Sequence, residues 1–320
     1  MADNLVYHYC STDVFQQIIS NKKIRLSDIT KSNDSAELKW ASRYVKDMFM
    51  EKYESAAQAT KYFREGYPKE LFEQFLSQSI IETFDDDKRY YTFFVCCFSA
   101  VGDQLSQWRG YADDGKGLSI GFDQEKMKNS ADEEQERGGY YLIFDKVVYH
   151  ESEQKNIVKQ YADALISDLK LWAKSEVIEG NTELVTEYLF GKTMGNLFKR
   201  CVLLKNPFFI EEKEYRLCYL NTVEPMNEAK KKALERFRMK YKYSDLGDKS
   251  KKKPVITPEI GYYCRNSILV PYFDYSFDKS IVKEVIIGPK SKASERDIGE
   301  FLHNYGFHDV MVKKSAGTYR

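Results

Sequence analysis

The chain has 320 residues, of which 42% are hydrophobic and 15% aromatic, a composition that supports a large core and excludes an intrinsically disordered protein. Lysine plus arginine equals aspartate plus glutamate, 49 of each, so no overall field directs the chain to nucleic acid or to an anionic membrane. No run approaches the ~18 apolar residues that a membrane helix needs, and the N-terminus lacks the charged and apolar regions of a signal peptide. We therefore expect a cytoplasmic protein whose residues 1–320 form one elaborated domain.

The first third of the chain alternates between extended and helical patterns. Residues 5–10 read as a short strand, and "STDVFQQIISNKKI" reads as a helix capped by Ser11 or Thr12, with its apolar residues on one face. The segment "IRLSD" is extended again. Residues 36–87 are rich in charge and carry apolar residues at helical spacings, which predicts a helical insertion.

The middle of the chain begins with a buried strand. The run "YYTFFVCCFSA" (90–100) is almost continuously apolar and β-favouring, as in a strand buried on both faces. "DQLSQWRGYADDGKG" predicts a short helix and a glycine-bearing turn, and "LSIGFD" predicts the next strand. Acidic residues dominate 123–136, which predicts a solvated loop or helix. A further strand at "YLIFDKVVYH" precedes residues 151–200, which predict a second helical insertion.

The last third contains a strand whose two faces can be told apart. In "NPFFIEEKEYRLCYL" (206–220), Glu212, Glu214 and Arg216 share one parity and should lie on one face. Residues 226–253 carry eleven lysines and arginines against four carboxylates and form a basic insertion. Strands at "NSILVPYFDYS" and "VKEVIIGPK", a helix and a last strand close the chain. We expect an α+β fold with a split, mostly antiparallel sheet and helical insertions.

The sequence carries none of the common enzyme signatures. G-x-G-x-x-G, a P-loop, H-E-x-x-H and G-x-S-x-G are all absent. The six cysteines are scattered, without a C-x-x-C pair or a regular spacing to histidine, which predicts buried reduced thiols and no metal site.

The candidate site residues are polar residues on otherwise apolar strands. His8 can orient a ligand, or it can be a neutral core histidine that donates to a backbone carbonyl. Ser99 can contact a ligand or simply end its strand. The Glu-Glu-Arg face of 206–220 can line a site or carry solvent-exposed ion pairs across strands.

The "QWRGY" helix holds two further candidates, each with a structural alternative. Trp108 can stack on a ligand or fill the core. Arg109 can bind a phosphate or form a salt bridge with Asp113 or Asp114.

Several segments together resemble the marker segments of a bacterial family called domain of unknown function 2971. They span nearly the whole chain and read "YHYCSTDVFQQIISNKKIRLSDITKSND", "FSAVGDQLSQWRGYADDGKGLSIGFD", "NPFFIEEKEYRLCYL", "VKEVIIGPK" and "SAGTYR". The order and spacing of these segments carry the resemblance.

The opening strand and helix also resemble the start of ADP-ribosyltransferase-like folds, where "Y-H-x-T-x-x-x-x-L-x-x-I-L-x-x-G-L" is common. That resemblance implies that His8 holds the NAD ribose, that Trp108 or Tyr111 stacks on nicotinamide, and that Glu212 or Glu214 is the catalytic glutamate. It implies an ADP-ribosyltransferase-like core.

The chemistry implied by this resemblance is consistent with these residue types. Cleavage of the nicotinamide–ribose bond builds positive oxocarbenium character, which a fixed carboxylate stabilises more in the transition state than in the ground state. Ser99 would add a polar contact to the bound nucleotide. Arg216 or Arg109 could hold the pyrophosphate with two parallel hydrogen bonds, and no metal is needed.

Three functions follow as hypotheses. The first is an NAD-consuming protein that transfers ADP-ribose to a protein or nucleic-acid acceptor, or hydrolyses NAD, in bacterial defence. The second is a non-catalytic ligand-binding or sensor module. The third is nucleic-acid binding through 226–253, with Tyr241 and Tyr243 as contacts.

Overall fold

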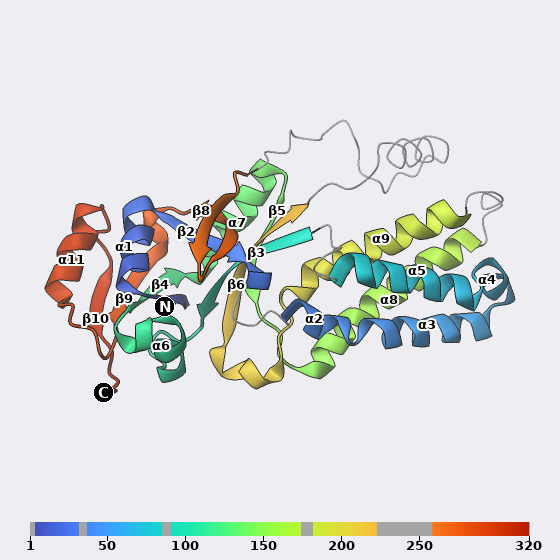
Figure 1. Ribbon diagram of the computed structural model, residues 1–320, viewed down its shortest axis with the longest axis horizontal. Helices are drawn as coiled ribbons and strands as arrows, with labels where there is room; N and C mark the ends of the chain where they lie inside the picture. The colour runs from blue at the N-terminus through green and yellow to red at the C-terminus, as the bar shows by residue number, and fades with distance from the viewer. Residues whose placement is uncertain (1–3, 32–36, 85–90, 174–181, 223–257, 320) are drawn as a thin grey trace.

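The computed structural model describes residues 4–31, 37–84, 91–173, 182–222 and 258–319. The molecule is elongated, with a sheet-containing part at one end and a helical bundle at the other (Figure 1). The predicted basic insertion at 226–253 lies outside the described residues, so the nucleic-acid hypothesis stays a prediction. Within the described part of the chain, no helix is long and apolar enough to cross a membrane.

Strands and helices alternate along the chain. The strands are β1 (Leu5–Cys10), β2 (Lys23–Asp28), β3 (Tyr91–Ser99), β4 (Leu118–Asp123), β5 (Tyr141–Lys146), β6 (Glu214–Thr222), β7 (Gly261–Arg265), β8 (Ile268–Ser276), β9 (Val282–Ile287) and β10 (Met311–Lys314). The α-helices are α1 (Thr12–Asn21), α2 (Glu37–Ser42), α3 (Val45–Ala59), α4 (Lys61–Gly66), α5 (Lys69–Phe84), α6 (Leu105–Tyr111), α7 (Gln124–Gly138), α8 (Glu151–Ala173), α9 (Thr182–Cys201) and α11 (Glu295–Asn304). Short 3₁₀ turns include η1 (Ile29–Lys31), η2 (Asp113–Gly115) and η4 (Pro207–Glu212).

The ten strands form one sheet in the order β10-β9-β4-β1-β3-β2-β8-β7, with β6 and β5 as a branch from β3. Among the strand pairs of the described residues, β9 with β10 is parallel and the others are antiparallel. The structure is therefore a mixed α and β fold with a mostly antiparallel open sheet, as the sequence predicts at this level of detail.

The sheet divides beside β3. One edge of this long strand pairs with β6 from end to end. The other edge is shared, because β1 pairs at Ser99 while β2 pairs at Val95 and Phe94. Residues 96–98 of β3 lie between these two partners, and this division positions the site described below.

Successive side chains along each strand point to opposite faces of the sheet, so the sheet has two faces with different neighbours. The first face packs against the apolar stripes of α1, α7 and α11, represented by Phe15, Met127 and Leu302, in one large core. On the second face, α6 covers β1, β4 and β9 through a small cluster around Trp108 and Tyr9. The helical bundle covers the β3–β6 pair on the same second face.

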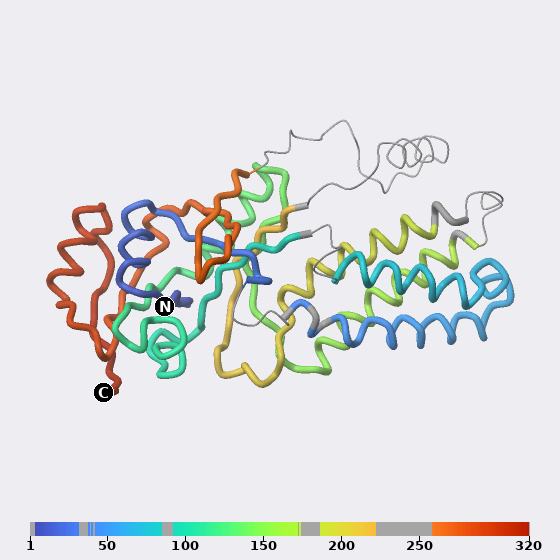
Figure 2. Tube along the Cα trace, in the orientation of Figure 1, coloured from blue at the N-terminus to red at the C-terminus, as the bar shows by residue number. Residues whose placement is uncertain are grey.

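The helical bundle is built from two segments far apart in the sequence. Helices α2–α5 occupy 37–84 and helices α8 and α9 occupy 151–173 and 182–201, within the two predicted helical insertions. They pack on one another and run side by side away from the sheet (Figure 2). Their shared core includes Phe49, Phe72 and Phe190, each buried almost completely. The two insertions thus form one unit.

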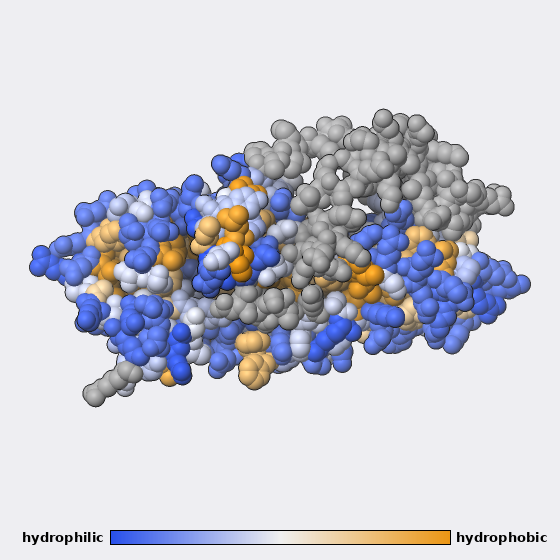
Figure 3. All heavy atoms as spheres, in the orientation of Figure 1, coloured by the Kyte–Doolittle hydropathy of each residue, from blue (hydrophilic) through white to orange (hydrophobic). Residues whose placement is uncertain are grey.

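The surface exposes apolar residues at two places near the sheet. Tyr262, Ile268 and Leu269 of the β7–β8 hairpin are more than half exposed, and Phe208 of η4 is 82% exposed. Figure 3 shows the hairpin as an orange area and the η4 turn as a paler protrusion at the lower edge.

Candidate functional site

A cleft of about 460 Å³ opens where β1 and β2 separate beside β3. Its walls come from β1, β2, β3, β7, the start of β6, helix α6 and the η4 turn. Five of the predicted site residues line it, namely His8, Ser99, Tyr111, Glu212 and Glu214. They come from four separate stretches of the chain, so the fold brings together residues that the sequence only suggested.

His8 spans the division in the sheet. Its Nδ1 lies 3.0 Å from the carbonyl oxygen of Cys97, in the stretch of β3 between its two partner strands. Since a carbonyl only accepts hydrogen bonds, Nδ1 carries the hydrogen and Nε2 remains an acceptor. Burial lowers the pKa of His8, while the bond to Cys97 opposes that shift, so the imidazole is neutral near pH 7. His8 bonds to a backbone carbonyl and also lines the cleft, so its contact with a ligand stays a prediction.

Glu214 lies at the base of the cleft with both carboxylate oxygens in ion pairs. Arg216 donates from Nε to Oε1 at 2.8 Å and from Nη2 to Oε2 at 3.1 Å, and Lys205 Nζ donates to Oε2 at 2.9 Å. Burial alone would raise the pKa of Glu214. The charges of Arg216 and Lys205, with hydrogen bonds from Arg216 and Cys97, outweigh burial and lower the pKa to about 2. Glu214 is therefore a fixed carboxylate at neutral pH.

Glu212 is the more accessible of the two acids. Its side chain is 14% exposed, against 4% for Glu214. Lys205 Nζ donates to its Oε2 at 2.5 Å, and the Tyr111 hydroxyl donates to its Oε1 at 3.1 Å. Tyr111 is about half exposed, and burial of its hydroxyl and the nearby Glu212 charge raise its pKa, so this phenol stays protonated.

The prediction that Glu212 lies on the same strand as Glu214 is wrong. Residues 207–212 form the 3₁₀ turn η4, which starts with the Asn206 side chain accepting from the Phe208 amide and ends at Lys213, whose φ is +45°. The strand begins at Glu214. Glu212 still reaches the cleft, because the turn folds back over the end of β3.

Ser99 fixes that turn. Its hydroxyl donates to the carbonyl of Glu212 at 2.8 Å and accepts from the Val101 amide at 3.2 Å, and the residue is 2% exposed. The Ala100 amide also donates to the Lys213 carbonyl at 2.9 Å. Ser99 therefore holds Glu212 through the backbone, and this hydroxyl is already engaged within the protein.

Three predicted ligand contacts lie elsewhere. Trp108 is 1% exposed, donates to Asp103 at 2.7 Å and packs edge-on against Tyr9, so it is a core residue. Of the two predicted aromatics, Tyr111 is the one that lines the cleft. Arg216 is fully buried and binds Glu214, so it offers no surface to a pyrophosphate. Arg109 is exposed to solvent and is not among the residues that line the cleft.

Asp114, one of the two predicted partners of Arg109, bonds to other residues. Its pKa is lowered by hydrogen bonds from Lys290 and Tyr319, and the Arg109 charge also helps to lower it. Asp114 accepts from Lys290 at 2.8 Å and from the Tyr319 hydroxyl at 2.8 Å. This corner of the protein joins the turn after α6 to the C-terminal segment.

Sequence reasoning missed the cations at the rim of the cleft. Arg25 of β2, Lys31 of η1 and Arg265 of β7 line it together with Tyr263. Arg25 is 40% exposed, lies over the ring of Tyr272 at 3.7 Å and pairs with Asp274 at 3.3 Å. The period-two pattern of "KIRLSD" could have revealed Arg25, because it shares a face with Ser27 and not with the buried apolar residues.

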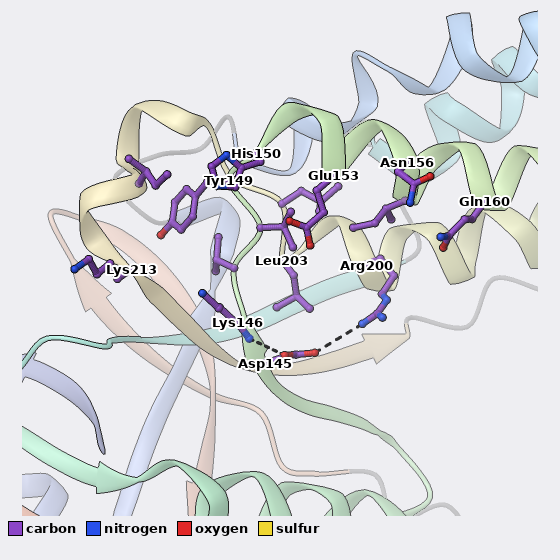
Figure 4. A pocket seen from close by; sticks show the side chains of 15 residues that line it. Asp145, Lys146, Tyr149, His150, Glu153, Asn156, Gln160, Arg200, Leu203 and Lys213 are labelled. Atoms are coloured by element: carbon purple, nitrogen blue, oxygen red, sulfur yellow. Dashed lines mark hydrogen bonds and ion pairs between the residues drawn. The ribbon is translucent and has the colours of Figure 1, made fainter. Parts of the chain in front are cut away.

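A second cavity of about 570 Å³ lies beside the η4 turn (Figure 4). It is bounded by the end of β5, α8 and the end of α9, with Tyr149 on one side, Glu153 above, and Arg200 and Asp145 opposite. Arg200 and Asp145 are both half exposed and 3.9 Å apart, which makes a weak pair. The predicted site residues are not among those that line this cavity, so the cleft beside β3 is the better candidate.

The two cavities share one wall. Phe209, Glu212 and Glu214 line the cleft, whereas Ile210 and Lys213 line the second cavity. Tyr149 lines the second cavity too, and its hydroxyl oxygen accepts the Glu214 amide at 3.0 Å. In the described part of the chain, no cluster of three or more histidine, cysteine or acidic residues could hold a metal ion.

Comparison with known proteins gives one result. A family model described as "Protein of unknown function (DUF2971)" matches residues 107–217, a segment that includes Tyr111 and both glutamates of the cleft. No curated protein and no solved structure matches the chain. The match confirms, over residues 107–217, the resemblance to this family described from the sequence.

Proposed function

We propose that the cleft beside β3 binds NAD or a closely related nucleotide and cleaves the bond between nicotinamide and ribose. One observation carries this proposal. His8, Tyr111 and the neighbouring pair Glu212 and Glu214 come from three distant parts of the sequence and line a single cleft whose volume suits part of a nucleotide. An imidazole, an aromatic ring and carboxylates are the groups that such a reaction uses, and their convergence supports an ADP-ribosyltransferase-like core.

The state of His8 favours a sugar ligand. With hydrogen on Nδ1, the free Nε2 accepts a hydrogen bond, and a ribose hydroxyl is a suitable donor. The bond to the Cys97 carbonyl also fixes the ring orientation. A neutral acceptor of fixed direction orients a sugar without adding charge to the cleft.

The rim of the cleft favours phosphates. Arg25, Lys31 and Arg265 come from three different elements and line one cleft. Arginine can form two parallel hydrogen bonds to a phosphate, which fixes its orientation. These residues replace Arg216 and Arg109 in the proposed role of pyrophosphate contacts.

Glu212 is the acid that would contact the ligand. It is more exposed than Glu214, and its Oε1 is shared only with the hydroxyl of the half-exposed Tyr111 among the contacts described above. When the C–N bond breaks, its electron pair leaves with nicotinamide and positive charge develops on the ribose. The Glu212 carboxylate would stabilise that charge in the transition state. Water or an acceptor group then adds to the sugar.

A second candidate function is a binding or sensor module. Both carboxylates are already paired with buried cations, Glu214 with Arg216 and Lys205 and Glu212 with Lys205. Such pairing reduces the negative potential available to an oxocarbenium ion. This observation favours ligand binding without turnover, and the assay below separates the two functions.

The proposal is tested by incubating the full-length protein with NAD labelled in nicotinamide and measuring both release and binding. We expect release by the wild-type protein and a loss of at least about 100-fold in Glu212→Gln and His8→Asn. His150→Asn is the matched control, because this exposed histidine lines the second cavity.

Each outcome of this assay discriminates between the functions. Binding that depends on His8 without release would support the binding module. Absence of NAD binding would refute the proposal. The role in bacterial defence, the cytoplasmic location and the identity of any acceptor are parts of this proposal that follow only after activity is established.

A further inference from the structure

One buried lysine in the cleft has no counterpart among the residues predicted from the sequence. Lys205 is 5% exposed, although lysine is almost never fully buried unless it is paired. Its Nζ lies 2.5 Å from Glu212 Oε2 and 2.9 Å from Glu214 Oε2. One ammonium group thus bridges the two candidate acids.

The backbone on both sides of Lys205 is held firmly. Its amide donates to the Val148 carbonyl at 3.1 Å, and its carbonyl accepts from Nε2 of the completely buried Gln154 at 2.7 Å. The side chain then passes the ring of Phe209, whose centroid is 5.0 Å from Nζ. These contacts fix the position of the ammonium group before any ligand binds.

The two acids belong to different elements, although one residue separates them in the sequence. Glu212 ends the η4 turn and Glu214 begins β6, with Lys213 in a left-handed conformation between them. Because both acids contact the same nitrogen, their carboxylates lie within two hydrogen-bond lengths of each other. Two like charges so close in a buried site would force one of them to take up a proton unless a cation lies between them.

We infer that Lys205 is a positioning residue, which holds Glu212 beside Glu214 as two ionised carboxylates facing one ligand. This inference deepens the proposed function, because it assigns a task within the same cleft and rests on that function for its catalytic consequence. Arg216 already pairs with both oxygens of Glu214, so it is Glu212 that depends on Lys205 for a counter-ion.

The other titratable groups that face this pair do not replace Lys205. Arg216 on β6 contacts Glu214, Cys97 on β3 donates to Glu214, Tyr111 on α6 donates to Glu212, and Tyr149 before α8 accepts the Glu214 amide. The phenols and the thiol act through hydrogen bonds and carry no positive charge that could replace the ammonium group. Lys205 is the cation that contacts both acids among the described contacts.

The test compares Lys205→Met, Lys205→Arg and Lys213→Met in the full-length protein. Lys213 is exposed on the same segment and lines the other cavity, so it is the matched control for loss of a lysine charge. The carboxyl carbons of the glutamates are followed by ¹³C NMR during a pH titration, and nicotinamide release is measured over the same pH range.

We expect Lys205→Met to raise the titration midpoint of the Glu212–Glu214 pair by at least about one pH unit. The acid limb of the release profile should move by the same amount. Lys205→Arg should restore both, and Lys213→Met should change neither. Unchanged titration in Lys205→Met would overturn the inference.

A double variant covers the case in which Lys205→Met does not fold. Replacing Glu212 as well, in Lys205→Met/Glu212→Gln, removes the repulsion and should restore folding. If the double variant also fails to fold, Lys205 does not act by neutralising Glu212 and the inference is overturned. A protein that releases no nicotinamide but shows the titration shift would refute the proposed function and leave the role of Lys205 intact.

Discussion

Glu214→Gln should change how the stability of the protein depends on pH. The folded protein lowers the pKa of Glu214 from an ordinary 4.5 to about 2. A group whose pKa is lowered on folding stabilises the protein above its unfolded pKa and loses that contribution as the pH falls toward the folded value. The shift corresponds to about 3 kcal/mol, of which about 2 kcal/mol is lost by pH 3.

The substitution has a second effect that does not depend on pH in this range. Glutamine removes the charge that pairs with Arg216 and Lys205, which are both buried. Leaving buried cations without their partner costs about 3–5 kcal/mol. The variant should therefore be less stable than the wild-type protein at pH 7, and the difference should shrink by about 2 kcal/mol at pH 3.

Urea unfolding followed by tryptophan fluorescence at several pH values from 7 to 3 measures this difference. Glu153→Gln is the control, because this glutamate is exposed at the second cavity. Its substitution should leave the pH dependence of the unfolding free energy unchanged. A difference between wild type and Glu214→Gln that stays constant from pH 7 to pH 3 would refute the assignment of Glu214 as a strongly stabilised carboxylate.

Three further predictions use different parts of the fold. Gly117→Ala should destabilise the protein by about 2–3 kcal/mol, since its Cβ would lie 2.1 Å from the Cys10 carbonyl oxygen. In contrast, the Cβ of Gly110→Ala in α6 would meet nothing within 4 Å, so this substitution should stabilise the protein by about 0.5–1 kcal/mol. Chemical denaturation compares the two, and equal effects would contradict the close approach of the Cys10 carbonyl to Gly117. Trp108→Phe loses a buried hydrogen bond and should cost about 2 kcal/mol in unfolding free energy. The NAD affinity of this variant, measured by calorimetry, should equal that of the wild type. A large loss of affinity would show that Trp108 contacts the ligand. Arg25→Gln should weaken NAD binding about tenfold and reduce its salt dependence in the same assay, because a rim cation is removed; unchanged affinity would exclude Arg25 as a phosphate contact.

Local patterns predicted the elements around the cleft well. The alternation in residues 5–10 and the cap at Ser11 identify β1 and α1, and Ser11 does accept from the Val14 amide. The continuous apolar run of β3 correctly indicates a strand with cores on both faces. These features depend on residues near one another in the chain, which is why periodicity reveals them.

Long-range pairing could not be predicted in the same way. Helical spacing indicates two separate insertions, but nothing local states that α3 packs against α8 and α5 against α9. Arg216 shows the same limit. The sequence predicted which residues share its face of the strand, but not that this face is buried. Only the fold shows that the Val202 carbonyl accepts its Nη1 at 2.5 Å.

The η4 turn was missed for a local reason. Apolar and charged residues in "NPFFIEE" suggest a strand, but Asn206 caps the following amide and Pro207 starts a 3₁₀ turn. The Asn-Pro pair was the available signal for a turn. The lysine that completes the site, Lys205, had no signal at all, because its importance depends on two acids brought to it by folding.

The four charges at the base of the cleft have a consequence for how a ligand enters. Glu212, Lys205, Glu214 and Arg216 cancel one another, so the interior presents almost no net field, while the mouth carries Arg25 and its neighbouring cations. Phosphates of an approaching ligand would therefore be attracted to the rim cations, and the balanced charges at the base would not draw them further in. The rim would thus act on the approach of the ligand, and the base on its bound position.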